Sequence, residues 1–379
     1  MCAQPSDHDE TINPFAPSLT QLNFYLTQGC NLACRHCWLS PRLDPIGSRY
    51  PVLAVDRFLS AITEAKSLGL KTVKLTGGEP LLHPAFLNLL DIVYREGHNV
   101  VIETNGVLIT PQIASAIATF SQRFVSVSLD GTNAETHEWV RGVKGCFEQA
   151  LRGIRYLIEA GIRPQIIMSL MRVNVKQIDD MINLAEEMGA ASVKFNVVQP
   201  IVHGEQLLKT EEILKVEELV QFGQYVYLEL APTTDLKLFF DLPLAFRPLS
   251  SMANGDGCGV CSIFNILGIL PTGHYALCGI GKHIPEMVFG EVGLDALTDV
   301  WLSHPMLENI RANIPKHLTG ICAACLLRTQ CLGSCIAQNY YRSEKTTAPY
   351  WFCQDAYELG LFPVSRLQRI LKGEELIAA

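Results

Sequence analysis

The sequence predicts an α/β protein: a partial (βα)6 barrel of the TIM type, followed by a small cysteine-rich domain. Two observations indicate this class. Strand-like and helix-like segments alternate through the first two-thirds of the chain, which is typical of a parallel sheet whose strands are joined by helices. Eight of the thirteen cysteines then lie beyond residue 257, where the alternation stops. We therefore expect two structural units with different chemistry.

Six short segments rich in apolar and β-branched residues predict the strands of the barrel. They are Leu22–Leu26, Thr72–Leu75, Val100–Glu103, Phe124–Leu129, Gln165–Leu170 and Ser192–Val198. Between them, apolar residues recur at helical spacing, first at Val55, Phe58, Leu59, Ile62 and Leu68. The later amphipathic segments are Phe86–Arg95, Phe147–Ala160, Ile178–Met188 and Glu211–Leu230. Six strand-then-helix units predict a parallel sheet curled into part of a barrel.

The chain divides into five predicted segments. Residues 1–20 form an N-terminal extension, residues 21–235 the barrel and residues 258–360 the cysteine-rich domain. Proline, serine, asparagine and glycine cluster between residues 243 and 257, so residues 236–257 are predicted to be a linker. Residues 361–379 are predicted to form a C-terminal helix.

Composition excludes several classes of function. The formal net charge is −8 and there is no long basic run, so the sequence predicts no contact with nucleic acid. The apolar runs are too short to cross a membrane, and residues 1–20 lack the apolar stretch of a signal peptide. We therefore expect a cytoplasmic protein, in which reduced cysteines favour metal binding over disulfides.

Three closely spaced cysteines follow the first predicted strand: Cys30, Cys34 and Cys37. Three thiolates at this spacing can hold three irons of a [4Fe–4S] cluster and leave the fourth iron open to a ligand. Two other interpretations remain open on spacing alone. A zinc site would use a further nearby ligand such as His36, and a dithiol redox pair would use only Cys34 and Cys37.

The segment Thr76-Gly77-Gly78-Glu79-Pro80 follows the second predicted strand. Its glycines allow a ligand to approach the backbone, Glu79 offers a carboxylate to a cationic group, and Pro80 fixes the exit from the strand. By itself this segment could be a turn. Together with the three-cysteine run, it resembles the radical S-adenosylmethionine (SAM) enzymes. In that family the open iron binds the amino and carboxylate groups of SAM, which is cleaved to a 5′-deoxyadenosyl radical.

Polar residues also follow the later predicted strands, at the sheet edge where ligands of such folds bind. The resemblance implies that Arg141 meets the SAM carboxylate, although a surface salt bridge is its other interpretation. It further implies that Asn105 and Ser128 contact the ribose or methionine part of SAM. Trp38 takes the place of an aromatic near the adenine, but could be a core residue. The predicted cofactor-binding set is Trp38, Gly77, Gly78, Glu79, Pro80, Asn105, Ser128, Asp130, Arg141 and Asn196.

The eight later cysteines form a second array that resembles the SPASM extension of radical SAM enzymes. Eight thiols are the number that two fully ligated [4Fe–4S] clusters need, and two zinc sites are the alternative. The resemblance assigns one auxiliary cluster to Cys258, Cys261, Cys278 and Cys335, and another to Cys322, Cys325, Cys331 and Cys353. We therefore expect three [4Fe–4S] clusters and SAM as cofactors. Cys2 and Cys146 remain, and neither is expected to bind metal.

SPASM-bearing enzymes mostly modify peptides or proteins, as sactipeptide maturases, mycofactocin maturase, sulfatase maturases and spliceases do. The resemblance therefore implies a maturase of a ribosomally synthesised precursor peptide, which abstracts a hydrogen and leads to crosslinking, backbone splicing or epimerisation. The alternative is oxidation of a small molecule, of the haem side-chain or aminoglycoside type. A third hypothesis is a non-enzymatic iron–sulfur protein, against which the complete set of SAM motifs argues.

Several details refine this expectation. Gly279 stands directly after Cys278, where sulfatase maturases carry an aspartate base, and this speaks against that activity. Residues 1–20 are too few for a leader-binding winged-helix domain, so we expect a separate leader-peptide recognition protein or direct leader capture. A flavodoxin- or ferredoxin-type reductant is expected as well. The sequence singles out no catalytic acid or base; the polar candidates near the expected opening are Glu103, His203, His274 and Lys282.

Overall fold

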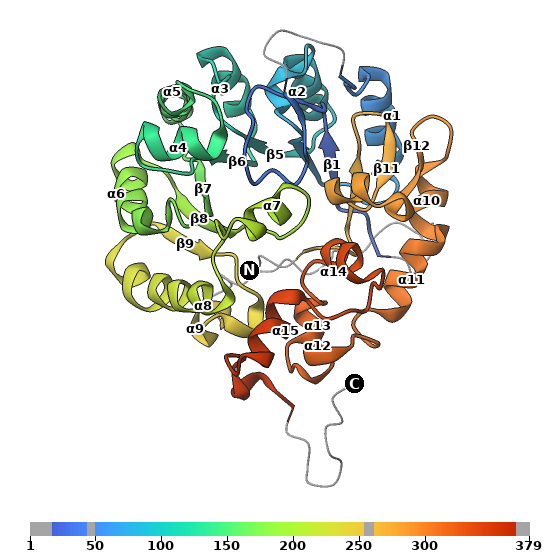
Figure 1. The fold of residues 1–379 in the computed structure, drawn as a ribbon. Helices are drawn as coiled ribbons and strands as arrows, with labels where there is room; N and C mark the ends of the chain where they lie inside the picture. Colours follow the sequence, from blue (N-terminus) through green and yellow to red (C-terminus); the bar gives the residue numbers. More distant parts are fainter. Residues whose placement is uncertain (1–16, 44–49, 254–260, 369–379) are drawn as a thin grey trace.

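The computed structural model describes residues 17–43, 50–253 and 261–368. Within these residues the main sheet has ten strands in the order β12-β11-β10-β1-β4-β5-β6-β7-β8-β9. Neighbouring strands from β10 to β9 run parallel, while β11 and β12 extend one edge antiparallel. Figure 1 shows the parallel strands in an arc with helices along its outer side. The predicted partial barrel is confirmed.

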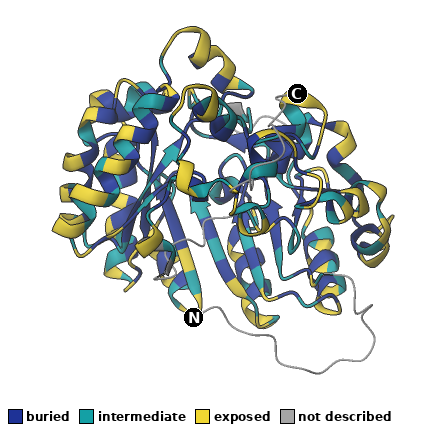
Figure 2. Ribbon diagram, turned by 90° about the horizontal axis from the view of Figure 1, so that it is seen from below, coloured by how far each residue is buried: buried dark blue, intermediate teal, exposed yellow. Residues whose placement is uncertain are grey.

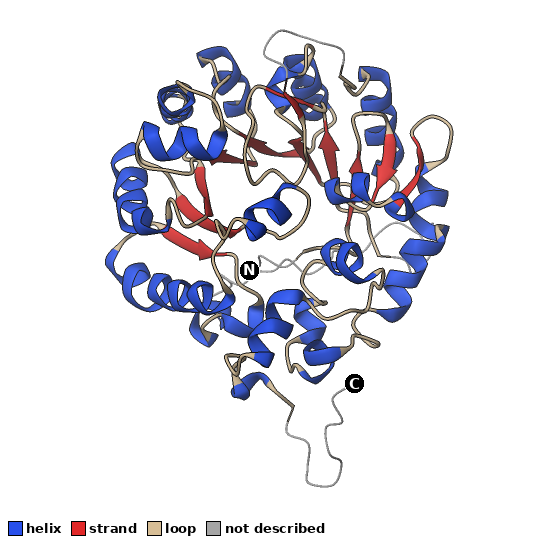
Figure 3. Ribbon diagram, viewed as in Figure 1, coloured by secondary structure: helices blue, strands red, loops and turns tan. Residues whose placement is uncertain are grey.

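The strands are β1 (Gln21–Tyr25), β2 (Gly29–Cys30), β3 (Arg42–Leu43), β4 (Thr72–Thr76), β5 (Asn99–Thr104), β6 (Arg123–Ser128), β7 (Gln165–Leu170), β8 (Ser192–Val197), β9 (Lys237–Phe240), β10 (Ile266–Ile269), β11 (His274–Ala276) and β12 (Val288–Glu291). The helices of the barrel are α1 (Val55–Lys66), α2 (Phe86–Arg95), α3 (Pro111–Ala118), α4 (Ala134–Arg141), α5 (Cys146–Glu159), α6 (Ile178–Met188), α7 (His203–Lys209), α8 (Val216–Tyr225) and α9 (Leu249–Ala253). The cysteine-rich region has α10 (Leu297–Ser303), α11 (Pro305–Asn313), α12 (Gly320–Ala324), α13 (Arg328–Cys331), α14 (Ile336–Ser343) and α15 (Trp351–Glu358). Figure 3 shows that helices dominate this second region.

The alternation of side chains along each barrel strand separates the core from the interior of the barrel. In β4, Val73 and Leu75 are fully buried in the hydrophobic core, whereas Lys74 and Thr76 line an interior cavity. Figure 2 shows buried strands in the middle and exposed residues mainly on the outer sides of the helices. The apolar stripes of the helices therefore cover one face of the sheet, and the other face is left for polar chemistry.

The boundary between the two predicted domains is crossed by the sheet. The predicted linker at 236–257 is not purely a linker, because it contains β9, which pairs in parallel with β8. The cysteine-rich region likewise contributes β10, whose residues pair in parallel with β1 from Gln21↔Ile266 to Phe24↔Ile269. Backbone hydrogen bonds of the sheet thus join both regions into one framework.

Two predicted helices differ from the structure. The segment Glu211–Leu230 becomes helical only at Val216, and α8 passes into a π-helical turn at Val226–Leu230. The predicted C-terminal helix is not helical over residues 361–368, which hold a 3-10 turn at Val364–Arg366 and a bridge between Cys325 and Leu367. Its remainder and residues 1–16 lie outside the described residues. No helix in the described part of the chain combines the length and apolarity needed to span a membrane.

Candidate active site

The three-cysteine loop is held by the end of α4. The backbone N–H of Ala33 donates to the carbonyl of Arg141, and that of Arg35 donates to the carbonyl of Val140, each at 3.0 Å. Gly142 ends the helix in the left-handed conformation, with φ 73°. A Cβ at this position would stand 2.6 Å from the carbonyl oxygen of Ala33, so glycine is needed for the loop to approach so closely.

Cys30, Cys34 and Cys37 all line one cavity of about 400 Å³ inside the barrel mouth, and none forms a disulfide. Burial raises the pKa of Cys30 above its ordinary range and raises the pKa of Cys37 to about 11. Thiols buried in this way ionise at neutral pH when a metal replaces their protons. The donor set and its burial therefore fit the iron sites of a cluster.

Glu79 is almost completely buried, at 1% exposure, and also lines the cavity. Its carboxylate accepts hydrogen bonds from the hydroxyl of Thr104 at 2.7 Å, the backbone of Asn105 at 2.8 Å and the backbone of Leu81 at 3.2 Å. Burial raises the pKa of Glu79 to about 7. The described chain gives this carboxylate no ion-pair partner, so a bound cationic group would fit it.

The loop after β4 needs glycines for its own packing as well as for the approach of a ligand. Gly77 has φ 137°, and a Cβ at Gly78 would stand 2.0 Å from the carbonyl oxygen of Gly29. They therefore let the loop after β4 pack directly on the backbone that leads into Cys30. Both glycines also line the cavity, whereas Pro80 is buried at the start of a 3-10 turn and does not.

Arg141 forms a buried ion pair, which excludes the surface salt bridge considered above. Its Nε lies 2.7 Å from Oδ2 of Asp130, and the two side chains are 7% and 0% exposed. Its Nη1 donates to Sγ of Cys34 at 3.4 Å. Asp130 does not line the cavity; its other oxygen accepts the backbone N–H of Ser169 at 2.7 Å. Asp130 therefore positions the guanidinium of Arg141 from the side that faces away from the cavity.

The other predicted cofactor residues converge on the same cavity. Trp38, Asn105, Ser128 and Asn196 all line it. The side chain of Asn105 donates to Oδ1 of Asn31 at 2.7 Å and lies 3.9 Å from Sγ of Cys30, so it is close to the cysteine loop. Nine of the ten predicted cofactor-binding residues thus surround or directly support one space.

The far side of the cysteine loop is held by the turn that follows Cys278. In this 3-10 turn (Gly279–His283), the ammonium of Lys282 donates to the carbonyls of Leu39 and Ser40. The imidazole of His283 donates to the carbonyl of Trp38 at 2.9 Å. Lys282, a catalytic candidate in the sequence, is therefore engaged in positioning the loop.

The remaining polar candidates have different surroundings. Glu103 lines the cavity and pairs with the ammonium of Lys74 at 2.6 Å. Burial raises the pKa of Glu103, but the charge of Lys74 outweighs it and the pKa lies below its ordinary value. His203, the first residue of α7, lies 3.2 Å from the hydroxyl of Ser40. The side chain of His274 is 41% exposed, lies beside Thr272 and does not line the cavity.

The later cysteines form two groups. Cys322, Cys325, Cys331 and Cys353 line one small cavity of about 20 Å³. Burial and then the charges of the other three thiols raise the pKa of Cys353. Likewise, burial and the charges of Cys261 and Cys278 raise the pKa of Cys335. Cys258 lies outside the described residues. No three His, Cys, Asp or Glu side chains of the described chain close around a single metal ion.

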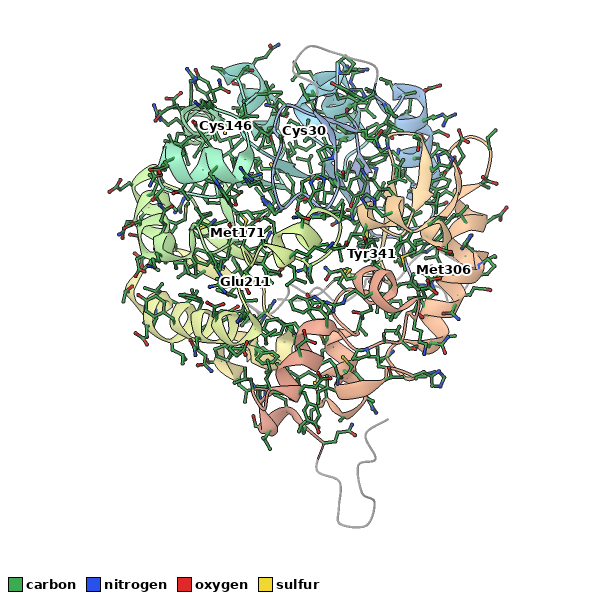
Figure 4. All side chains as sticks on the ribbon, viewed as in Figure 1. Cys30, Cys146, Met171, Glu211, Met306 and Tyr341 are labelled. Carbon is green, nitrogen blue, oxygen red and sulfur yellow. The ribbon has the colours of Figure 1, made fainter. Side chains whose placement is uncertain are left out.

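Cys146 belongs to neither group of later cysteines. It is 1% exposed and packs with Cys30 and Leu32, and Figure 4 labels Cys146 and Cys30 in the same upper part of the molecule. It does not line the cavity that the three cysteines share.

Sequence reasoning missed Lys74, Asp241 and Gln338, which also line the main cavity. Lys74 could have been found, because it lies two residues before Thr76 on the same face of a predicted strand. Gln338 comes from α14 in the second region, and no local pattern signals its position in the barrel mouth.

Comparison with known proteins agrees with this geometry. The model of the Radical SAM superfamily matches residues 24–185. Mycofactocin maturase MftC of Mycobacterium ulcerans is 30% identical over 342 residues, which covers 89% of this chain and 88% of that protein. AdoMet-dependent heme synthase of Methanosarcina barkeri is 29% identical over 332 residues, covering 83% and 90%. The crystal structure of SuiB from Streptococcus suis bound to precursor peptide SuiA has the same fold, with a TM-score of 0.70 at 18% identity, covering 89% of this chain and 76% of that one.

Proposed function

This chain belongs to the radical SAM superfamily, and on that premise we propose that it is a maturase that modifies a ribosomally synthesised precursor peptide. Enzymes of this superfamily use a [4Fe–4S] cluster and SAM. When bound, these cofactors supply a 5′-deoxyadenosyl radical that abstracts a hydrogen from the substrate. The described residues then have to hold the cofactors, orient the substrate and exclude water.

The cofactor-holding roles follow from burial and charge. Cys30, Cys34 and Cys37 would bind three irons and leave one iron open. Arg141, fixed by Asp130, would receive the carboxylate of SAM, because a guanidinium presents paired donors to a carboxylate. Glu79 would receive the amino group, because its buried carboxylate has hydrogen bonds but no cationic partner in the described chain.

The size and lining of the cavity carry the proposal of a peptide substrate. Its volume of about 400 Å³ lies near the lower end of the ~300–1,000 Å³ typical of small-molecule sites. SAM alone would take much of that space. The residues that remain at the inner wall are polar or charged, among them Lys74, Glu103 and Asp241. Such a remainder suits one side chain of a peptide presented from outside better than a flat apolar macrocycle.

We further propose two auxiliary clusters, one on each group of later cysteines. The charges of neighbouring thiols act on Cys335 and on Cys353, which supports a cluster on each group, and Cys258 of the first group lies outside the described residues. We assign these clusters to electron transfer away from the substrate or to structural support. A separate leader-peptide recognition protein and a flavodoxin- or ferredoxin-type reductant complete the proposed set of partners.

A second candidate is oxidation of a small molecule of the haem side-chain type. The observation that favours it is the 29% identity to AdoMet-dependent heme synthase, close to that with the mycofactocin maturase. The cavity favours the peptide, and the following experiment separates the two functions.

Anaerobic co-expression with each short peptide encoded beside the gene, followed by mass spectrometry, tests the proposal. Loss of two hydrogens indicates crosslinking or desaturation, loss of a residue-sized fragment indicates splicing, and deuterium uptake from heavy water at unchanged mass indicates epimerisation. Unchanged peptides together with continued deoxyadenosine formation would count against a peptide substrate. In that case, conversion of a porphyrin with carboxyalkyl side chains would identify the second candidate.

A further inference from the structure

A second cavity adjoins the first and lies beside auxiliary cysteines. Its volume is about 130 Å³, and Cys261, Cys331, Cys335 and Tyr350 are among its lining residues. Gln199, Asp241 and Gln338 line both cavities, so these three side chains form the junction between them. Cys261 and Cys335 belong to one proposed auxiliary cluster, so the junction lies between the barrel mouth and that cluster.

The carboxamide of Gln338 at this junction lacks a partner. Gln338 is 6% exposed, and its Oε1 accepts no hydrogen bond from any described residue. Gln165, another buried glutamine, shows the usual situation, because its amide lies within hydrogen-bond distance of Ser126 and Ser192. A buried amide oxygen without a partner is destabilising, so such atoms are rare in native proteins and call for an explanation.

The opposite side of the junction is already fixed. Oε1 of Gln199 accepts from the hydroxyl of Tyr350 and the indole of Trp351, each at 3.3 Å, and its Nε2 donates to the carbonyl of Val197. Gln199 thus links the end of β8 to the start of α15 through hydrogen bonds. Asn196 of β8 also lines the larger cavity. Its Oδ1 likewise lacks a hydrogen-bond partner among the described residues.

We propose that Gln338 is a substrate-binding residue that hydrogen-bonds the backbone amide of the peptide next to the modified residue. A carboxamide offers one acceptor and two donors, the same groups that a peptide bond can satisfy. The unpaired oxygen can accept a hydrogen bond from a backbone N–H of the substrate. Figure 1 shows α14, which carries Gln338, across the opening of the arc from β6 and β7, so the contact would reach the peptide from the auxiliary side.

This inference rests on the proposed function because it takes a peptide as substrate, but its test does not need the natural substrate. The probe is acetyl-glycyl-glycine N-methylamide, which presents only peptide backbone, and its comparison is acetyl-sarcosyl-sarcosine dimethylamide, which has no N–H. Binding to the reconstituted holoenzyme is measured by saturation-transfer NMR. The variants are Gln338→Met, which removes the amide at similar length, and Gln338→Glu, which keeps an acceptor. Gln122→Leu, an exposed glutamine before β6, is the control.

The wild type and Gln122→Leu should bind the glycine probe in preference to the sarcosine probe. Gln338→Met should weaken binding of the glycine probe at least about five-fold, the effect of one hydrogen bond of about 1 kcal/mol, and Gln338→Glu should retain it. Equal binding by Gln338→Met, or no preference of the wild type for the glycine probe, would overturn the assignment. The assignment would also be overturned if Gln338→Met bound the glycine probe normally but altered the EPR signal of the auxiliary clusters. Gln338 would then act on a cluster and not on the substrate. If the glycine probe binds in a Gln338-dependent way but no precursor peptide is modified, the proposed function is wrong. The assignment of Gln338 as a backbone-binding residue would still stand.

Discussion

The ring of Tyr25 occupies the space beside Gly279 that any larger residue would need. A Cβ at position 279 would stand 2.3 Å from Cε1 of the tyrosine and 2.7 Å from its hydroxyl oxygen. Tyr25 is 6% exposed and packs with Leu270 and Ala276, so its ring has little room to move. The ring of Tyr25 therefore leaves no room for the aspartate that the resemblance to sulfatase maturases would place at position 279.

Substitution of Gly279 should therefore destabilise the protein. We expect Gly279→Ala to lower the free energy of unfolding by about 1–3 kcal/mol through overpacking, and Gly279→Asp to lower it further because it also buries a charge. Thermal unfolding measures both. Tyr25→Ala should reduce the cost of Gly279→Ala in a double-mutant cycle. Gly161→Ala is the control, because a Cβ there meets no atom and only the left-handed backbone, φ 76°, is strained. A normal unfolding temperature for Gly279→Ala would contradict this packing.

Removing cysteines by group should remove iron by group. The three variants are Cys30→Ala/Cys34→Ala/Cys37→Ala, Cys261→Ala/Cys335→Ala and Cys322→Ala/Cys353→Ala. Each should lower the iron content by about four per chain, and only the first should abolish deoxyadenosine formation. Iron, sulfide and zinc analysis of the anaerobically purified chains measures this.

The control for the cysteine variants is Cys146→Ala. Cys146 is 1% exposed and packs beside Cys30, yet we expect full iron content when it is replaced. Zinc in place of iron in either auxiliary group would contradict the assignment of that cluster.

Arg141 and Asp130 should act as a unit in SAM binding. Arg141→Gln should raise the dissociation constant of SAM at least about ten-fold, because a charge-assisted hydrogen bond contributes about 1.5–3 kcal/mol. Asp130→Asn should raise the dissociation constant of SAM less than Arg141→Gln does, because Asp130 does not line the cavity. It should lower the free energy of unfolding by about 3–5 kcal/mol, because it breaks a buried ion pair.

Equilibrium dialysis with labelled SAM and thermal unfolding separate the two effects of this pair. Arg172→Gln, which breaks an exposed pair with Glu218, should change neither quantity measurably. Additive effects of Arg141→Gln and Asp130→Asn on SAM binding would show that the two residues act independently.

The turn after Cys278 should control the cysteine loop from a distance. Lys282→Met/His283→Phe removes the donors to the carbonyls of Trp38, Leu39 and Ser40. We expect slower SAM cleavage and loss of iron from the first cluster, with the iron of the auxiliary groups retained. His274→Phe, which changes a half-buried histidine that does not line the cavity, is the matched control. Wild-type rates of SAM cleavage in the double variant would show that the loop needs no such support.

Local features of the sequence were sufficient for the framework of the barrel. The strand predicted at Gln165–Leu170 and the helices predicted at Phe86–Arg95 and Ile178–Met188 have the observed bounds. Their apolar periodicity lies within short windows, and so does the spacing of Cys30, Cys34 and Cys37. The missed strand β9 has only four residues and is followed by a proline-rich segment, so the turn residues around it dominated the pattern.

The sequence by itself determined which residues carry the chemistry, because thiol spacing and strand periodicity are properties of neighbouring residues. The tertiary structure decided how those residues are used. Only folding buries Arg141 against Asp130, closes β10 onto β1, brings His283 to the carbonyl of Trp38 and places Gln338 in the barrel mouth. The last three contacts join segments more than a hundred residues apart, and the burial of the first depends on such packing. No local pattern contains the distance between residues so far separated along the chain.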